Sequence, residues 1–574
     1  MFAVVKPYCI DIFNYRRRKA DNIVIGNTSL GGNEAIRVQS MTNTNTLDTP
    51  SSVKQCIAII NAGGTLVRLT AQGVREAENL KNIHAKLRNE GYTTPLVADI
   101  HFNPKAAEVA ALYVEKVRIN PGNFVSFNEV MTLSKPLTEE NELTKIRQKL
   151  LPLLAICKDH KTAIRIGVNH GSLSERIMNK YGNTAQGMVV SAMEFLQLCK
   201  EEGFNDVVIS MKSSNTLVMM HSVRLLIAAM EDDNMHYPLH LGVTEAGDGE
   251  DGRIKSAVGI GALLADGIGD TIRVSLSEAP ELEIPVAKKL IAYIDRRKNH
   301  LPIQGLVAKK FNPYSYTRRE TVAVQNIGKD QVPVVFVEKE DTYSIEPDII
   351  VEKISSYGFH LLHLSYSQLA TTNLAQLANK KDTVLLLQVE GENPVGEMRA
   401  CFHALLEANC KLPVVINIRY QENDVESLQV KAGADFGALL LDGFGDGIFI
   451  QNNGTITNET LNNISFGILQ AARVRSSKTE YISCPGCGRT LFDLQSTIAR
   501  IKAQTAHLKG LKIGIMGCIV NGPGEMADAD YGYVGAGKGK VSLYKKQDCI
   551  EKNIPEEEAV EKLIALIKEN GDWQ

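Results

Sequence analysis

The 574-residue chain has few cysteines, a single tryptophan, almost no net charge and no long hydrophobic run. Ten cysteines are too few for a disulfide scaffold of this size, and seven stand alone, so we expect those seven to be buried thiols. Lys and Arg (63) nearly balance Asp and Glu (66), which excludes a protein that coats nucleic acid. No run of about 18 apolar residues is present, so we expect no membrane span.

Eight short apolar runs alternate with amphipathic segments in the first half of the chain. Such near-continuous apolar runs are typical of parallel strands that are covered on both faces. Eight of these units within about 240 residues predict a (β/α)8 TIM barrel rather than an open doubly wound sheet. The runs are residues 36–42, 65–71, 95–102, 116–122, 163–171, 206–214, 238–247 and 271–277.

The rest of the chain predicts two further domains. We divide the chain into a barrel domain (1–299), an inserted α/β domain (300–477) and a C-terminal α+β domain (478–574). Residues 437–450 repeat residues 261–274 at nine of fourteen positions, which favours a degenerate barrel in the insertion; a recurring helix–loop–strand connection is the alternative. The strands expected in the insertion are residues 332–338, 360–365, 383–389, 413–420 and 438–443.

Five cations follow or interrupt the apolar runs of the barrel. In a TIM barrel the site lies at the carboxyl ends of the strands, so these cations are expected to converge there. They would repel one another unless an anion bound among them, and Arg and Lys are suited to phosphate oxygens. Any one of them could simply form a salt bridge, but together they predict a phosphate or diphosphate ester as ligand. The five are Arg68, Arg118, Arg165, Lys212 and Arg273.

Other polar residues are expected at the same rim: Asp99, His101, Asn120, Asn169 and Glu245. Asp99 or His101 alone would more often be structural. Glu245 is more informative, because a carboxylate among cations is expected to stay ionised and can still donate a proton to a departing oxygen.

Three cysteines differ from the others in their spacing. Cys484 and Cys487 form a CPGC motif, and Cys518 begins CIVNGPGE, which ends at Glu525. A structural zinc site needs a fourth soft ligand, and His507 is the only histidine between Cys487 and Cys518, inside an expected helix. Three thiolates with glycine-rich turns favour an iron–sulfur cluster. A [4Fe–4S] cluster would then have one iron left for a weaker ligand, and Glu525 is the candidate.

The order of these motifs resembles a known family. VQSMTNTNTLDT, VRLT, ADIHF, VRINPGN, RIGVNHGSL, SMKSSN, LGVTEAG and DTIRVSLS precede CPGCGR and MGCIVNGPGE. They resemble 4-hydroxy-3-methylbut-2-enyl diphosphate synthase of the methylerythritol phosphate pathway. The resemblance implies reductive ring opening of 2-C-methyl-D-erythritol 2,4-cyclodiphosphate with loss of water. It also implies ferredoxin or flavodoxin as the electron donor.

The resemblance assigns roles to residues of this chain. It implies a [4Fe–4S] cluster on Cys484, Cys487, Cys518 and Glu525, and the substrate could displace Glu525 from iron, which makes Glu525 a catalytic candidate as well. Glu245 is the acid/base candidate. The diphosphate falls to Arg68, Arg118, Arg165 and Lys212, with His101 and Asn169 nearby. We extend the substrate site to Asp99, Asn120 and Arg273.

The insertion of about 180 residues departs from the short form of this family and resembles its three-domain form. A spacer of this length could let one chain close its own barrel, so monomer and homodimer both stay open. Because residues 1–19 do not read as a transit peptide, we expect a bacterial cytoplasmic enzyme rather than one of the plastid stroma. Two alternatives are a sulfite- or nitrite-reductase-like iron–sulfur protein and a zinc-binding scaffold.

Overall fold

The computed structural model describes residues 7–125, 139–389, 391–519 and 522–573. Its contacts divide the chain into two compact units. The barrel unit consists of Lys19–Gly252, Gly269–Lys288 and Lys478–Gln574, and the inserted unit of Met1–Arg18, Arg253–Ile268 and Lys289–Ser477. In the described part of the chain, no helix has the length and apolarity needed to cross a membrane.

The barrel unit contains the eight parallel strands that the sequence predicts. Neighbouring strands follow the order β8-β7-β6-β5-β4-β3-β10-β9, and a parallel bridge from Ile209 to Leu239 brings the ends of this sheet together into a nearly closed barrel. The TIM-barrel prediction is therefore confirmed. The strands are β3 (Arg37–Met41), β4 (Leu66–Thr70), β5 (Leu96–Asp99), β6 (Lys116–Ile119), β7 (Ala163–Asn169), β8 (Val207–Lys212), β9 (His240–Leu241) and β10 (Thr271–Ile272).

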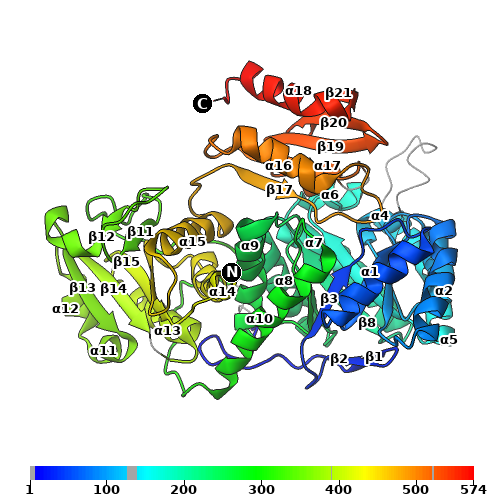
Figure 1. The fold of residues 1–574 in the computed structure, drawn as a ribbon. Coiled ribbons are helices and arrows are strands. Elements are labelled where there is room, and N and C mark those ends of the chain that lie inside the picture. Colours follow the sequence, from blue (N-terminus) through cyan, green and yellow to red (C-terminus); the bar gives the residue numbers. More distant parts are fainter. Residues whose placement is uncertain (1–6, 126–138, 390, 520–521, 574) are drawn as a thin grey trace. The chain divides into compact units, whose positions relative to one another are not determined.

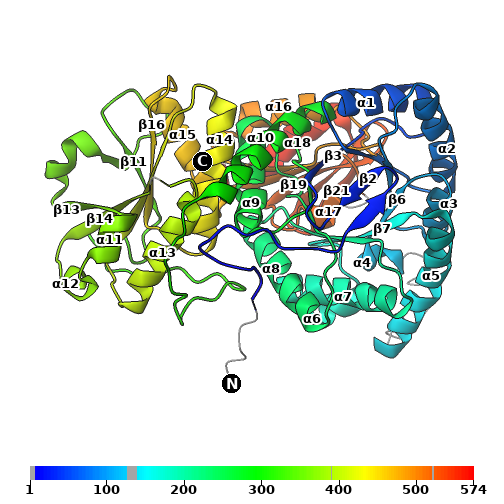
Figure 2. The same cartoon turned by 90° about the horizontal axis from the view of Figure 1, so that it is seen from below.

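Helices connect successive strands along the chain, and Figure 2 shows α1, α2, α3, α5, α7 and α8 around the barrel strands. Polar residues start several of these helices: the side chains of Asp48, Asn103, Thr184 and Asn215 each accept an N–H of the first turn. The helices are α1 (Thr49–Asn61), α2 (Val74–Asn89), α3 (Pro104–Ala111), α4 (Pro121–Phe124), α5 (Glu139–His160), α6 (Glu175–Tyr181), α7 (Ala185–Glu201), α8 (Thr216–Asp232), α9 (Gly249–Ala265) and α10 (Glu283–Asp295), with 3-10 turns η1 (Pro280–Leu282) and η2 (Arg296–Asn299).

A hairpin that the sequence did not reveal precedes the barrel. Its antiparallel strands are β1 (Ile23–Ile25) and β2 (Thr28–Leu30). Ile23, Ile25 and Leu30 form one buried cluster with residues of four barrel strands. These contacts fill the apolar interior away from the polar strand ends.

The C-terminal domain is α+β, as predicted, and in Figure 1 it is coloured orange to red. Its sheet order is β17-β18-β19-β20-β21, in which the first three strands are parallel and the last two pair antiparallel. One face packs on α16 and α18 through a core that includes Ile498, Ile513, Tyr531 and Leu563. The elements are β17 (Glu480–Ser483), α16 (Leu494–Thr505), β18 (Lys512–Met516), α17 (Gly522–Glu525), β19 (Tyr531–Gly537), β20 (Lys540–Lys545), β21 (Asp548–Pro555) and α18 (Glu556–Glu569).

The inserted unit has one parallel sheet of six strands in the order β12-β11-β16-β15-β14-β13. Along the chain, β11 is the first strand of this unit and β16 the last, and the two pair with each other, as β3 and β10 do in the barrel. Among the described residues, no pairing joins the edge strands β12 and β13. Its elements are β11 (Val334–Val337), β12 (Ile349–Ile350), η3 (Val351–Tyr357), β13 (His360–Ser365), α11 (Tyr366–Thr371), α12 (Leu374–Ala378), β14 (Thr383–Val389), α13 (Pro394–Glu407), β15 (Val414–Tyr420), α14 (Val425–Leu441), β16 (Gly447–Asn452) and α15 (Asn458–Ala471).

One strand prediction in the insertion is wrong. The apolar run 438–443 belongs to the end of α14 and the turn after it, and the strand follows as β16. The run misled because α14 is buried around most of its circumference, so its sequence lacks a polar face. Two glycines allow α14 to approach α9 closely: a Cβ on Gly433 would lie 2.9 Å from Ala257 Cβ, and one on Gly437 would lie 2.8 Å from Val258 Cα.

Candidate active site

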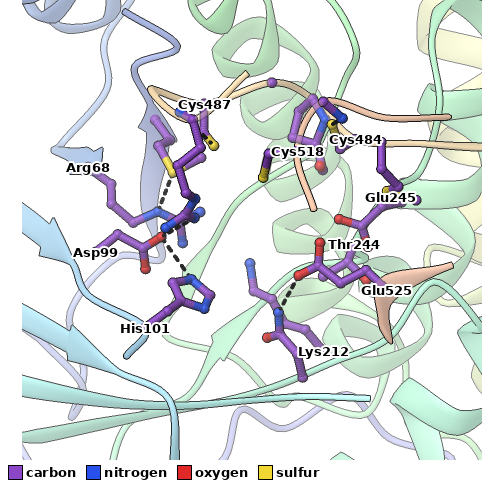
Figure 3. A pocket seen from close by; sticks show the side chains of 18 of the residues that line it. Arg68, Asp99, His101, Lys212, Thr244, Glu245, Cys484, Cys487, Cys518 and Glu525 are labelled. Atoms are coloured by element: carbon purple, nitrogen blue, oxygen red, sulfur yellow. Dashed lines mark hydrogen bonds and ion pairs between the residues drawn. The ribbon is translucent and has the colours of Figure 1, made fainter. Parts of the chain in front are cut away.

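A cavity lies inside the barrel unit, where the carboxyl ends of the barrel strands meet the C-terminal domain. It encloses about 740 Å³ of empty space, open solvent included. The barrel contributes Met41, Arg68, Asp99, His101, Arg118, Arg165, Asn169, Lys212, Val243, Thr244, Glu245, Arg273 and Ser275. The C-terminal domain contributes Cys484, Pro485, Gly486, Cys487, Arg489, Thr490, Met516, Gly517, Cys518, Gly522 and Glu525. In Figure 3 the cysteines lie on one side, and Asp99, His101 and Lys212 on the other.

Asn120 is the one residue of the predicted site that does not line this cavity. It is fully buried, and its Oδ1 accepts the backbone N–H of Gly122 at 3.2 Å as the cap of the short helix α4. This is a local role in turning the chain after β6.

Asp99, His101 and Arg118 form a buried network on one wall. Arg118 Nη1 donates to Asp99 Oδ1 at 3.2 Å and is also bonded to His101, while Nη2 donates to the Gly167 carbonyl at 3.0 Å and to Asn169 Oδ1 at 3.2 Å. A Cβ on Gly167 would lie 2.4 Å from Arg118 Nε, so the glycine makes room for this guanidinium.

The network sets the charge of its members. Burial, followed by the Arg118 guanidinium, lowers the pKa of His101 to about 3, so the imidazole is neutral at pH 7. Burial acts to raise the pKa of Asp99, but Arg68 and Arg118 outweigh it and hold that pKa well below its usual value. Asp99 is therefore the anion of this wall.

Three further cations face the cavity with little compensation. Burial and neighbouring cations lower the pKa of Arg165 and Lys212 well below their usual values, and burial lowers that of Arg68 to about 10. Arg165 forms no ion pair with a carboxylate in the described part of the chain, and its Nε and Nη1 have no hydrogen-bond partner there. Gly242 leaves space for Lys212, since a Cβ there would lie 2.8 Å from its Nζ. Asp99 partly compensates Arg68, whereas Arg165 and Lys212 form no ion pair with a carboxylate among the described residues, and a bound phosphate would supply that missing anion.

Arg273 differs from these cations because the protein already pairs it. Its Nε and Nη2 donate to the two oxygens of Glu283 at 2.9 and 2.8 Å, and both side chains are buried. Ser40 Oγ adds a 2.6 Å hydrogen bond to the same carboxylate. Arg273 thus lines the cavity with most of its charge neutralised.

Glu245 and Glu525 meet on the opposite wall. Burial, followed by the nearby Glu525, raises the pKa of Glu245 well above its usual value, which is the opposite direction to the ionised carboxylate that the sequence analysis expects. Glu245 has φ +47°, and its Oε2 is buried without a hydrogen-bond partner among the described residues. Glu525 Oε1 instead accepts the amide of Asn169 at 2.9 Å, which links the C-terminal domain to the barrel. A protonated Glu245 could act as an acid in this cavity.

The three cysteines and Glu525 line the same cavity, and the surroundings of the thiols suit a sulfur-bound group. The backbone N–H of Gly517 donates to Cys484 Sγ at 3.2 Å, and that of Arg489 donates to Cys487 Sγ at 3.4 Å. Such donors stabilise thiolates and tune iron–sulfur centres. Within the described ranges, no three His, Cys, Asp or Glu side chains gather closely enough to hold a single metal ion.

His507 is not placed as the sequence suggested. It follows α16, which ends at Thr505, and its ring packs edge-on against Trp573 with centroids 5.0 Å apart. It does not line the cavity that holds the cysteines. The fourth soft ligand that a zinc site would need is therefore not His507.

Arg489 is a residue of the cavity that the sequence analysis missed. It is buried, follows the CPGC motif by two residues, and its Nη2 lies 3.6 Å from Asp99 Oδ2 of the barrel. Burial opposes ionisation, but Cys487 and Asp99 outweigh it and raise the pKa of Arg489 above its usual value. The signal was present in the quoted CPGCGR motif, as an arginine next to two potential thiolates.

The fold and the cavity define the class of the protein: a TIM-barrel enzyme whose strand ends are covered by a cysteine-bearing domain. Residues 20–288 match the GcpE TIM-barrel domain, and residues 480–569 match the GcpE protein C-terminal domain. The chain belongs to the GcpE family, an iron–sulfur oxidoreductase family.

Relatives match the chain over almost its whole length. It is 56% identical to 4-hydroxy-3-methylbut-2-en-1-yl diphosphate synthase (flavodoxin) of Phocaeicola vulgatus, covering 98% of this chain and all of the relative. The protein of that name from Chlorobaculum tepidum is 39% identical and covers 99% of this chain and 91% of the relative. These relatives do not favour the reductase-like or zinc-scaffold alternatives. Among solved structures, a truncated 3-deoxy-D-arabino-heptulosonate 7-phosphate synthase from Thermotoga maritima aligns with 48% of this chain and 92% of its own, at 12% identity and a TM-score of 0.31.

Proposed function

We propose that the chain converts 2-C-methyl-D-erythritol 2,4-cyclodiphosphate to (E)-4-hydroxy-3-methylbut-2-enyl diphosphate. The observation that carries this proposal is one cavity in which uncompensated cations face three cysteines. The reaction consumes two electrons and one proton, opens the ring at the C–O bond to a phosphate oxygen, which leaves as an anion, and releases the hydroxyl group as water. The product is the compound after which the two relatives described above are named. Both relatives are bacterial. We extend the proposal to a cytoplasmic location.

The cations on the barrel side of the cavity bind the diphosphate. Arg165 supplies charge that has no ion-pair partner among the described residues, Lys212 adds a second buried cation, and Arg118 is held in place by Asp99 and Gly167. Arg68 is oriented by a 2.8 Å hydrogen bond from its Nε to Met41 Sδ. As the ring opens, one phosphate oxygen gains charge, and these fixed cations stabilise that charge without reorganising.

Cys484, Cys487, Cys518 and Glu525 would hold a [4Fe–4S] cluster, which supplies the two electrons when bound. Glu245 delivers a proton to the hydroxyl oxygen that leaves as water. Its burial and its neutral form fit this role, because a leaving hydroxide needs a proton in the transition state. The neutral His101 and the Asp99–Arg118 pair orient the substrate beside it.

The site forms within one chain in this proposal, because the C-terminal domain and the barrel of the same chain share the cavity. Ser277 Oγ donates to the Cys484 carbonyl at 2.9 Å, and Asn169 bonds Glu525. Mixing Glu245→Gln chains with Cys518→Ser chains tests this point. We expect no recovered activity under conditions that scramble tagged wild-type chains; substantial recovery would show a site shared between subunits.

The central test is anaerobic reconstitution followed by incubation with the cyclodiphosphate and a chemical reductant. We expect about four iron and four acid-labile sulfide per chain, as a [4Fe–4S] cluster requires, together with consumption of the cyclodiphosphate and formation of the linear diphosphate. Reconstituted protein with full iron that leaves the cyclodiphosphate intact would overturn the substrate assignment. Haem, or zinc without sulfide, would instead support one of the alternatives.

A further inference from the structure

A second hollow of the barrel unit adjoins the cavity and opens to solvent. It encloses about 1320 Å³ of empty space and is formed by the loop after β3, helix α1, the η1 turn and the start of α16. We call it the lateral groove. All of its walls belong to the barrel unit.

Only one turn of backbone separates the lateral groove from the cavity. Pro485, Gly486 and Thr490 line both hollows, and the first two are the residues between Cys484 and Cys487. Gly486 has φ +79°, and a Cβ on it would lie 3.7 Å from Cβ of Asn43, so this turn rests against the barrel side of the groove. Thr490 Oγ1 accepts the N–H of Cys487 at 3.0 Å and holds the turn in place. A redox group seated in the groove would therefore lie next to the cysteines without entering the substrate cavity.

The chemistry of the groove differs from that of the cavity. Its charged lining residues in the described part of the chain are Lys54, Glu281 and Asp493, so it lacks the excess of cations that suits a diphosphate. Phe492 is half-buried in its wall, and Leu282, which follows Glu281, is 46% exposed. Mixed apolar and neutral polar surface with a few rim charges is typical of a transient protein interface.

We propose that the lateral groove is the docking surface for a small flavoprotein electron donor, with the flavin edge seated over the Cys484–Cys487 turn. The proposal rests on the proposed function and on the flavodoxin named in the relatives. Each turnover oxidises reduced flavin by two electrons in total, and the cluster that the cysteines beneath this turn would hold would pass them to the substrate. The proton used in the reaction comes from Glu245, so the donor needs no access to the cavity.

Gln495→Trp and Lys54→Glu test the proposal at exposed positions on opposite walls of the groove. Gln504→Trp is the matched control: the same substitution on the same helix, also exposed, about 2.5 turns further on and so on the opposite face. The probe is a bacterial flavodoxin, reduced by NADPH and its reductase for rates and used in oxidised form for calorimetric binding. A parallel assay replaces flavodoxin by dithionite-reduced methyl viologen.

We expect the two groove variants to raise both the flavodoxin KM and its calorimetric Kd by about tenfold, the size of effect that one interface residue commonly has. Their rates with methyl viologen and their KM for the cyclodiphosphate should match wild type, and Gln504→Trp should match wild type in every assay. Unchanged flavodoxin binding in both groove variants would overturn the proposal. A raised cyclodiphosphate KM with methyl viologen would also overturn it, by making the groove a substrate entrance. Absence of wild-type turnover with methyl viologen would count against the proposed function instead.

Discussion

The barrel mouth and the inserted sheet use similar sequence for opposite purposes. Arg273 of the barrel corresponds to Phe449 in the repeated segment, and both side chains are buried. Phe449 packs in an apolar cluster with Phe336 and Val415, whereas Arg273 lies in the wall of a charged cavity. The same helix–loop–strand unit can therefore end either in a core or in a site, depending on the residues at its strand end.

The two regions also treat buried charge differently. In the inserted unit, Arg297 is bonded to Asp435, and Arg399 to Asp442 at 2.9 and 2.8 Å, so both of these buried arginines have a carboxylate partner. In the barrel, Arg165 has no such partner among the described residues. Buried ions without partners are costly, and such a cost is retained where a ligand compensates it. This contrast supports the proposed anion site in the barrel.

The largest effect is expected at the three cysteines that line the cavity, all of which belong to the barrel unit. Cys484→Ser, Cys487→Ser and Cys518→Ser should each lose the cluster and essentially all activity, because an alcohol is a poor iron ligand. Cys549→Ser is the control, since Cys549 lies on β21 and does not line the cavity. Iron and sulfide analysis with activity measures both properties. Wild-type iron in any of the first three variants would contradict the ligand assignment.

Glu245→Gln should lower kcat by roughly 10²–10⁴, the usual range for loss of a general acid, and leave substrate affinity within about tenfold. The amide keeps the size of the side chain but cannot release a proton. Steady-state kinetics with methyl viologen separates the two quantities. If KM rises strongly while kcat is unchanged, Glu245 binds substrate and donates no proton.

A matched pair of arginine substitutions tests the charge contrast directly. Arg165→Met should raise the free energy of unfolding of the ligand-free protein by about 1–3 kcal/mol, because it removes an unpaired buried charge. It should also lower kcat/KM by roughly 10²-fold. Arg297→Met should lower the free energy of unfolding by about 3–5 kcal/mol, because it leaves the buried Asp435 without its ion-pair partner.

Urea unfolding followed by circular dichroism measures the stability change in both arginine variants. The informative result is the opposite sign of the two changes. Destabilisation of similar size in both variants would show that Arg165 is a structural residue like Arg297, and the proposed anion site would lose its main support.

The smallest effect is a pH dependence. Since the pKa of His101 is about 3 in the fold against 6.5 in the unfolded chain, the unfolded state takes up a proton first as the pH falls. His101 therefore destabilises the fold progressively below pH 6.5, by up to about 1.4 kcal/mol per pH unit. His101→Asn should remove this part of the acid sensitivity between pH 6.5 and 5. Parallel stability profiles for the two proteins would contradict the assignment.

The sequence predicted what depends on periodicity and on local chemistry. Eight buried strands leave eight apolar runs, and the cations at their ends stand out because charge is rare in such runs. The prediction failed where the local apolar pattern does not reveal the type of element. Residues 438–443 look like a strand because a helix that is packed on most sides has no polar face. The sequence analysis also did not predict the β1–β2 hairpin, because strands of three residues are too short to show an alternating pattern.

The sequence by itself determined the barrel, its cation-bearing strand ends and the cysteine motif, because each depends on the order of residues along a short segment. Only the tertiary structure decided which of these charges are free. Glu283 neutralises Arg273, Asn120 turns inward to cap α4, and Glu525 reaches Asn169 from 356 positions away. Charge compensation and hydrogen bonding depend on distance in space and on side-chain direction, and none of these three contacts follows a repeating pattern that a single sequence shows.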